Sequence, residues 1–282
     1  MSNTPPTLLT LPAELRNQVF SYVVNDPEFC RDGFLHRNRP GGIYLDDEYT
    51  ATRALSILLT CRQFYYDLAI PAYTRTHFLA RSLYSPLPTL LLPLPSPLVA
   101  SIRHLAWVVG TRQFRSLVQW RTHPFDFPIP DGSADLDVIK TLRLDTLTLV
   151  LHASSYTHYP ADFTTDLVAL LRRLEGVKRI VFVRNRANVK GGFGRWFNRL
   201  VGLMLKVDHQ ERYDRVPAVL EKVWWEWGFD EVGETFELVA RASKPVMEEQ
   251  AYMEMVKPLV HGLMGRMERE EWDEDPRARN GF

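Results

Sequence analysis

The stretch LLTLPAELRNQVFSYVV (residues 8–24) has the most specific local pattern in the chain and predicts an amphipathic helix. Pro12 suits the first turn of a helix, and Glu14 lies where the helix dipole favours a carboxylate. An apolar side chain recurs every fourth residue, at Leu11, Leu15, Val19 and Val23. The opposite, polar face is expected to hold Arg16, Asn17 and Gln18. Such a helix must pack its apolar stripe against the rest of the chain or against a partner.

A second helical run follows in ALSILLTCRQFYYDLAIPAYTRTHF (residues 54–78). Its apolar positions are Leu55, Leu58, Leu59, Phe64, Tyr65 and Leu68. Pro71 limits this helix, and a loop rich in glycine, proline and charge (residues 25–49) separates it from the first run. Together the runs predict a helical cluster over residues 8–84, which is too small to be stable without the rest of the chain.

These two segments resemble the N-terminal region of the fungal F-box-like proteins. The pattern of that family is LPxELRxxI/VxxxV, then a loop, then LLxxCRQxYxExxxxxYxxxxF. The positions that match in place are Leu11, Pro12, Glu14, Leu15, Arg16, Cys61, Arg62, Gln63, Tyr65, Tyr73 and Phe78. Asp67 stands in for the acidic residue of the pattern, and the match covers about a quarter of the chain.

The resemblance implies a role in protein recognition. In F-box proteins this region docks the Skp-type adaptor protein of a cullin-RING ubiquitin ligase, and the remainder of the chain selects a protein substrate. The adaptor-docking residues here would be Leu11, Pro12, Leu15, Val19 and Val23. The alternative is that LPAELR simply begins the first core helix of a larger fold.

From residue 98 onward, apolar runs of strand length alternate with helical patterns. The expected strands are 101–109, 144–152, 177–184 and 236–242. The expected helices are 161–176, 194–210, 215–227 and 245–275, the last with a kink at Pro258. This alternation predicts an α/β (or α+β) fold, built either on an open, mostly parallel sheet or on an irregular leucine-rich-repeat-like arc.

The expected domain order follows from these segments. The F-box-like helical region (8–84) leads through a proline-rich connector (85–100) into a βα domain (101–272), and residues 273–282 form a loose tail. Four prolines interrupt the apolar segment at residues 87–100, so we expect no membrane-spanning helix and no membrane partner. The chain has only two cysteines and no signal-peptide pattern, which favours a cytoplasmic or nuclear location.

Charge is balanced overall but unevenly placed. The 34 basic and 34 acidic residues give a net charge of zero. Residues 172–215 carry 12 basic and 4 acidic side chains, whereas residues 220–275 carry 6 and 15. The basic and acidic segments are expected to pair with each other across the fold. The alternative is that the basic segment binds the backbone of RNA.

The chain offers no combination of residues that specifies an enzyme. A glycine cluster after the strand 177–184 could hold an anion at a helix N-terminus, through Lys190, Gly191, Gly192, Gly194 and Arg195. A strand-to-helix turn needs glycines in any case, so the turn alone is the simpler explanation of this cluster. The loop 152–162 contains His152 and His158 but no nucleophile motif. We therefore expect no catalytic residue, metal or cofactor.

The sequence as a whole favours a non-enzymatic protein-interaction module, with an F-box-type substrate adaptor as its most specific form. Its partners would be a Skp-type adaptor and an unknown protein substrate, with nucleic acid disfavoured. The alternative is a structural or binding protein without a ubiquitin role, including RNA binding through residues 172–215.

Overall fold

The computed structural model describes residues 7–25, 34–37, 42–81, 91, 93–110, 114, 117, 142–152, 163–189 and 191–272. The α-helices are α1 (Ala13–Asn25), α2 (Ala51–Leu55), α3 (Arg62–Arg75), α5 (Ser96–Ser101), α8 (Thr164–Leu171), α9 (Phe193–His209) and α10 (Glu249–Trp272). The strands are β1 (Leu35–Arg37), β2 (Ile43–Leu45), β3 (His77–Ala80), β4 (His104–Val109), β5 (Leu144–Leu151), β6 (Val177–Val183), β7 (Val223–Asp230) and β8 (Thr235–Ala242). Shorter turns are the 3-10 helices η1 (Leu8–Thr10) and η2 (Ser56–Leu59) and the π-helical turn η4 (Gln210–Asp214).

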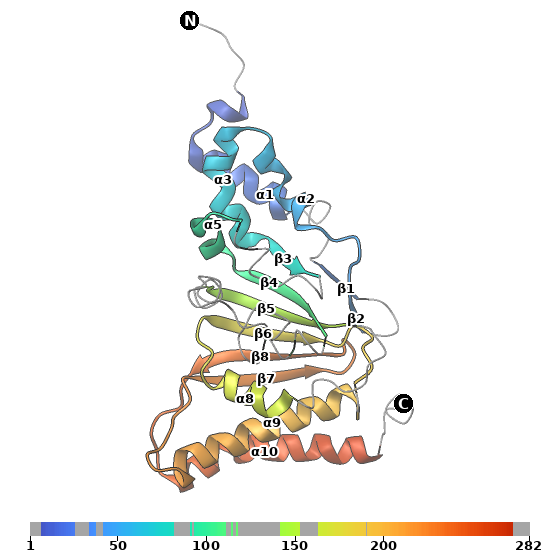
Figure 1. Ribbon diagram of the computed structural model, residues 1–282, viewed down its shortest axis with the longest axis vertical. Coiled ribbons are helices and arrows are strands. Elements are labelled where there is room, and N and C mark those ends of the chain that lie inside the picture. Colours follow the sequence, from blue (N-terminus) through green and yellow to red (C-terminus); the bar gives the residue numbers. More distant parts are fainter. Residues whose placement is uncertain are drawn as a thin grey trace, which may run out of the picture.

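Six strands form one open, mixed sheet in the order β3-β4-β5-β6-β8-β7 (Figure 1). The first four are parallel and follow one another along the chain, whereas β8 runs antiparallel to β6 and β7 antiparallel to β8. The α/β class predicted from the alternation of strands and helices is therefore confirmed. The parallel character predicted for the sheet holds from β3 to β6 and ends at β8.

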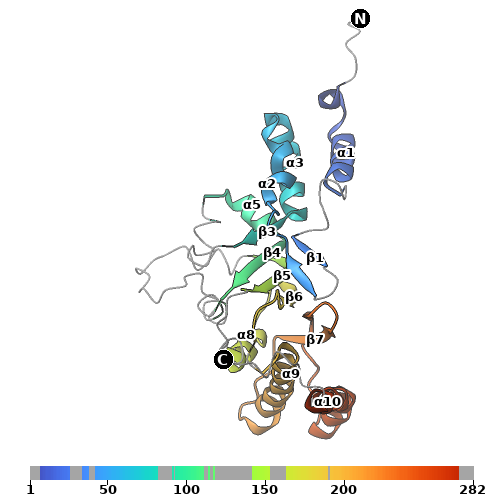
Figure 2. The ribbon, with the colours of Figure 1, turned by 90° about the vertical axis from the view of Figure 1, so that its right-hand side faces the viewer.

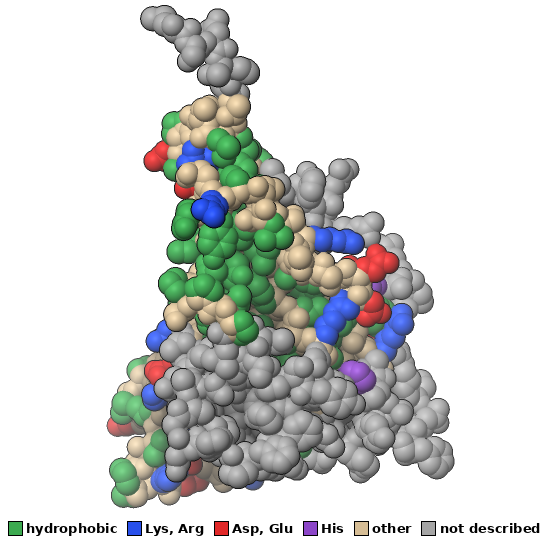
Figure 3. Space-filling view, turned by 45° about the horizontal axis from the view of Figure 1, so that its top comes forward, with side chains coloured by type: hydrophobic (Ala, Val, Ile, Leu, Met, Phe, Trp, Pro, Cys, Tyr) green, Lys and Arg blue, Asp and Glu red, His purple; other side chains and the backbone are tan. Residues whose placement is uncertain are grey.

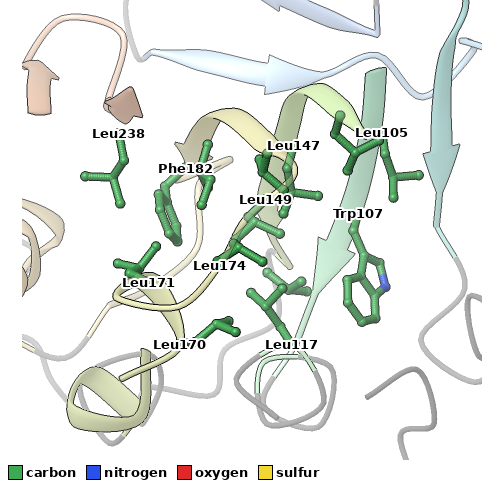
Figure 4. Close-up of a cluster of buried hydrophobic side chains, with 14 of the residues drawn as sticks. Leu105, Trp107, Leu117, Leu147, Leu149, Leu170, Leu171, Leu174, Phe182 and Leu238 are labelled. Atoms are coloured by element: carbon green, nitrogen blue, oxygen red, sulfur yellow. The ribbon is translucent and has the colours of Figure 1, made fainter. Parts of the chain in front are cut away.

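The central strand β5 is buried on both faces, which explains its nearly continuous apolar sequence. Leu147, Leu149 and Leu151 face the main core, and Val150 faces a second, smaller core. In the main core, side chains from the strands and from α8 point toward one another (Figure 4). The second core lies under the β1–β2 hairpin, whose Leu35, Ile43 and Leu45 pack against the opposite face of the sheet.

Helix α9 packs against both α8 and α10 at the β7 end of the sheet (Figure 2). Its Trp196 ring lies 5.3 Å from the ring of Phe182 on β6 and 5.1 Å from that of Phe236 on β8, measured between centroids. Phe182 and Phe236 stack at 4.3 Å. These large buried rings join the sheet to α9 through a continuous aromatic core.

One expected helix is a strand. Residues 215–227 were expected to be helical, but β7 begins at Val223 and pairs with β8 along its length. Trp225, Trp227 and Phe229 alternate along β7 on the face that joins the main core. The physical reason is period: these aromatic side chains recur every second residue, which suits a strand, and β8 supplies the hydrogen-bonding partner.

The helical N-terminal region is continuous with the sheet. β3 follows α3 after a single residue, Thr76, and pairs with β4 in parallel register from His77↔His104 to Ala80↔Trp107. The segment expected as a proline-rich connector (85–100) contains most of the short helix α5. Residues 82–90, 92 and the expected tail (273–282) lie outside the described residues.

Candidate functional site

Helix α1 is attached to α3 by one buried arginine. The Nε of Arg16 donates to Oδ2 of Asp67 at 2.8 Å, and its Nη1 donates to the carbonyl oxygens of Leu9, at 3.2 Å, and Leu11. Gln63 adds a hydrogen bond to the same carboxylate at 3.0 Å. The Gln63 hydrogen bond outweighs the opposing effect of burial and, together with Arg16, lowers the pKa of Asp67.

This attachment corrects the expected orientation of α1. Arg16, expected on the polar face, is only 9 % exposed, and Phe20, one turn later, is 2 % exposed. These two side chains form the face that packs against the rest of the molecule. An arginine can occupy such a position because Asp67 neutralises its charge and the two carbonyl groups accept hydrogen bonds from its Nη1.

The predicted docking stripe consequently faces outward. Leu15 is 45 % exposed and Val19 is 40 % exposed, while Pro12 is exposed and Leu11 is half-buried. Val23 belongs to α1, but its side chain lies outside what the structure describes. We call Leu15 and Val19, with the exposed Leu8, Leu9 and Tyr22, the α1 stripe.

Exposed apolar side chains continue onto the neighbouring helices. Leu59 of η2 and Tyr65, Tyr66 and Ile70 of α3 are all exposed. Figure 3 shows hydrophobic side chains gathered over this helical end of the molecule. Single exposed apolar residues are ordinary on protein surfaces, but a gathering of this kind is typical of a surface that contacts another protein.

Other residues of the F-box-like pattern hold the helices together. The Sγ of Cys61 accepts a hydrogen bond from the backbone N–H of Phe64 at 3.5 Å and so caps α3. Tyr73 is buried, and its ring centroid lies 5.1 Å from that of Phe78 on β3. The pattern therefore divides into residues that stabilise the helical region and residues that its outer surface presents.

The glycine cluster lies where it was expected, between β6 and α9. Gly191, Gly192, Gly194 and Arg195 line a cavity of about 410 Å³ at the N-terminus of α9. Lys190 lies outside the described residues. The cavity also takes residues from β7 and α10, which no local sequence pattern indicated.

A buried cluster of charged side chains lies at the C-terminal end of α9, and no local sequence pattern predicts it. The carboxylate of Asp208 accepts hydrogen bonds from Arg172 (2.8 Å), Arg212 (3.2 Å), Lys244 and the Tyr252 hydroxyl group (2.9 Å). Burial alone would raise the pKa of Asp208, but its interactions with Glu221, Lys244 and Arg172 more than offset this effect and lower the pKa. The donors come from four separate segments, so the cluster joins α8, α9, η4 and α10 to the end of β8.

A second carboxylate completes this cluster. Both oxygens of Glu221 accept from Nη2 of Arg212 at 2.6 Å, and one of them also accepts from the backbone N–H of Lys244 at 3.1 Å. Each charged group has partners within the protein, and the cavity beside it is only about 20 Å³. The cluster therefore has the character of a structural clamp rather than a ligand site.

Several basic residues of the 172–215 segment are paired with carboxylates. Arg179 pairs with Glu237 of β8, and Arg184 pairs with Glu234 at 2.5 Å. Like Arg212 with Glu221, these pairs join the basic and acidic parts of the sequence. The expectation that the two parts neutralise each other across the fold is confirmed for these three pairs, which leaves less positive charge for RNA.

The remaining expected chemistry falls largely outside the described residues. His152 follows β5, and its N–H donates to the carbonyl of Val109, whereas residues 153–162, including His158, are not described. Within the described ranges, no three His, Cys, Asp or Glu side chains gather as a metal site would require. Nor does any described helix have the length and apolar character needed to cross a membrane.

Comparison with protein-family models, with characterised proteins and with solved structures finds no match for this chain.

Proposed function

We propose that this protein is a non-enzymatic protein-interaction module that acts as an F-box-type substrate adaptor of a cullin-RING ubiquitin ligase. In this role the α1 stripe docks a Skp-type adaptor protein, and the βα domain holds a protein substrate. The work is done by apolar contact surfaces, without catalytic residues or a cofactor. A cytoplasmic or nuclear location belongs to the same proposal.

The observation that carries the proposal is the exposure of Leu15 and Val19 on a helix whose other face is anchored. If the LPAELR segment served only as a core helix, these side chains would be expected to lie against the sheet. Instead Arg16 and Phe20 provide the packing, and the apolar residues one position before each of them face outward. This arrangement supports a docking helix that is already formed and oriented before its partner binds.

The resemblance to fungal F-box-like proteins supplies the chemical identity of the partner. Its matched positions include both the exposed Leu15 and the anchoring Arg16. An adaptor surface that receives such a helix would itself be apolar, with the side chains of the α1 stripe as the buried contacts. Residues near the centre of such an interface carry most of its binding energy.

A binding experiment with purified components tests the proposal. The full chain is mixed with a Skp-type adaptor, alone and bound to cullin, and complex formation is followed by size-exclusion chromatography and calorimetry. We expect the wild-type protein to bind and the double variant Leu15→Asp/Val19→Asp to lose binding, because acidic groups cannot enter an apolar interface unpaired. Both positions are exposed, so the variant should keep the wild-type circular dichroism spectrum.

The matched control is Met253→Asp/Met255→Asp on α10. These side chains are 49 % and 40 % exposed, close to the values for the two α1 positions, but lie on a helix packed against α9 at the other end of the molecule. The control should bind the adaptor as the wild-type protein does. Absence of a complex with the wild-type chain, or equal loss in both double variants, would refute docking through the α1 stripe.

A further inference from the structure

The cavity at the N-terminus of α9 is formed where four segments meet. The end of β6 contributes Arg184, the turn before α9 contributes Gly191 and Gly192, and α10 contributes Arg266 and Arg269. The turn between β7 and β8 closes the remaining side. The volume of about 410 Å³ lies within the range of roughly 300–1,000 Å³ that is usual for small-molecule sites.

The start of α9 presents backbone N–H groups without a side-chain cap. Its N-cap residue is Gly192, at φ 92° and ψ 151°, a conformation that residues with a side chain rarely adopt. The first turn contains no acidic residue, and Arg195 stands where a carboxylate would normally be favoured. A helix start of this kind accumulates positive potential that an external anion would neutralise.

A buried amide side chain independently indicates a ligand. Asn198 lines the cavity and is only 4 % exposed, yet its Oδ1 has no hydrogen-bond partner among the described residues. Gly194 lies one turn earlier on the same helical face and contributes no side chain there. A buried polar atom without a partner is costly, and a ligand with polar atoms at this point would satisfy it.

The charges around the cavity favour an anion with two negative charges. Among the described residues that line it, four are arginines (Arg184, Arg195, Arg266 and Arg269) and two are glutamates (Glu231 and Glu234). Within the described part of the chain, neither Arg266 nor Arg269 forms an ion pair with a carboxylate. The guanidinium of Arg266 instead lies over the rings of Phe197 and Phe229, at 5.5 and 5.7 Å from their centroids.

We infer that this cavity is a binding site for a phosphate group carried on a larger organic molecule. A phosphate monoester carries close to two negative charges near neutral pH and matches the surplus of two arginines. Its oxygens accept from the helix N–H groups, and the amide of Asn198 can rotate to donate through Nδ2 or, when the phosphate is monoprotonated, accept from its hydroxyl group. The remaining volume takes the organic part beside Phe229. This inference does not depend on the proposed adaptor role.

Calorimetry on the full chain tests the site and distinguishes the source of the phosphate. The probes are inorganic phosphate, adenosine monophosphate, a phosphoserine peptide and the same peptide without phosphate. We expect the phosphorylated probes to bind, the unphosphorylated peptide to fail, and added salt to weaken binding. Tighter binding of the nucleotide assigns a small metabolite, and tighter binding of the phosphopeptide assigns a modified protein; either result supports a phosphate site.

Two variants and a matched control locate the binding. The double variant Arg266→Ala/Arg269→Ala should weaken binding by at least about tenfold, because it removes two charge-assisted donors. Its control, Arg173→Ala/Arg199→Ala, removes the same charge from exposed positions that do not line the cavity and should bind as the wild type does.

A third variant does not depend on removing charge. Gly194→Leu suits the helix and adds a side chain at a residue that lines the cavity, so it should abolish binding while the protein remains folded by circular dichroism. The inference is wrong if no phosphorylated probe binds at millimolar concentration. It is also wrong if the arginine variant and its control weaken binding equally, or if folded Gly194→Leu binds like the wild type.

Discussion

Replacing Asp208 with asparagine is expected to destabilise the protein more than any exposed charge substitution. The side chain of Asp208 is 2 % exposed and neutralises cations on Arg172, Arg212 and Lys244. Asparagine has nearly the same shape, so packing is retained and only the charge and one pair of acceptor sites change. Arg212 and Lys244 would then share the carboxylate of Glu221, and Arg172 would keep its hydrogen bond to the carbonyl of Val219.

The magnitude follows from the burial of the partners. Removing one partner of a buried ion pair usually costs about 3–5 kcal/mol, because the remaining charge is left without compensation and without water. The side chains of Arg212 and Lys244 are 2 % and 6 % exposed, so water cannot take the place of the lost carboxylate. We therefore expect Asp208→Asn to lower the free energy of unfolding by about 3–5 kcal/mol.

Urea denaturation followed by tryptophan fluorescence measures this loss, with the slope of the transition checked for constancy. The control is Glu226→Gln, which removes an equivalent arginine–carboxylate pair whose side chains are 57 % and 60 % exposed. That change should cost less than about 1 kcal/mol. If Asp208→Asn costs no more than the control, the buried cluster does not clamp α9 to the sheet, and the reasoning fails.

Two further predictions concern the β3 edge and the anchor of α1. Burial, together with the charge of the nearby His104, lowers the pKa of His77 to about 4, so the unfolded chain binds more protons between pH 6.5 and 4. The contribution of His77 to the free energy of unfolding is complete above pH 6.5 and is lost on acidification, by about 3 kcal/mol. The variant His77→Gln should abolish this loss. Urea titrations at several pH values measure it. Asp67→Asn should weaken the attachment of Arg16 and speed hydrogen exchange in α1 while leaving β5 protected. Unchanged exchange in α1 would show that another contact holds this helix.

Local sequence patterns located most of the long strands and helices after residue 100. The strands β4, β5, β6 and β8 and the helices α9 and α10 lie where apolar periodicity predicted them. The β7 strand could have been found as well, since Trp225, Trp227 and Phe229 alternate at period two.

The side-chain contacts that sequence reasoning missed join segments that are distant in the sequence. Arg16 looked solvent-exposed because its partner Asp67 is 51 residues away. Of the residues that line the cavity at α9, only the glycines and Arg195 form a local pattern. Arg266 joins them from α10, and the burial of Asn198 becomes apparent only in the folded structure. Propensity and periodicity describe neighbours along the chain, and such contacts exist only after folding.

The positions of the two surfaces make them separately testable and functionally compatible. Figure 1 places α1 and α3 beyond the β3 edge of the sheet, and α9 and α10 at the opposite end. A protein docked on the α1 stripe therefore leaves the cavity at α9 accessible. The four paired residues of β3, which follow α3 after a single residue, keep the helical end in register with the sheet. The two surfaces share no residue. Failure of adaptor binding would therefore not contradict the proposed phosphate site, and failure of phosphate binding would not contradict docking through the α1 stripe.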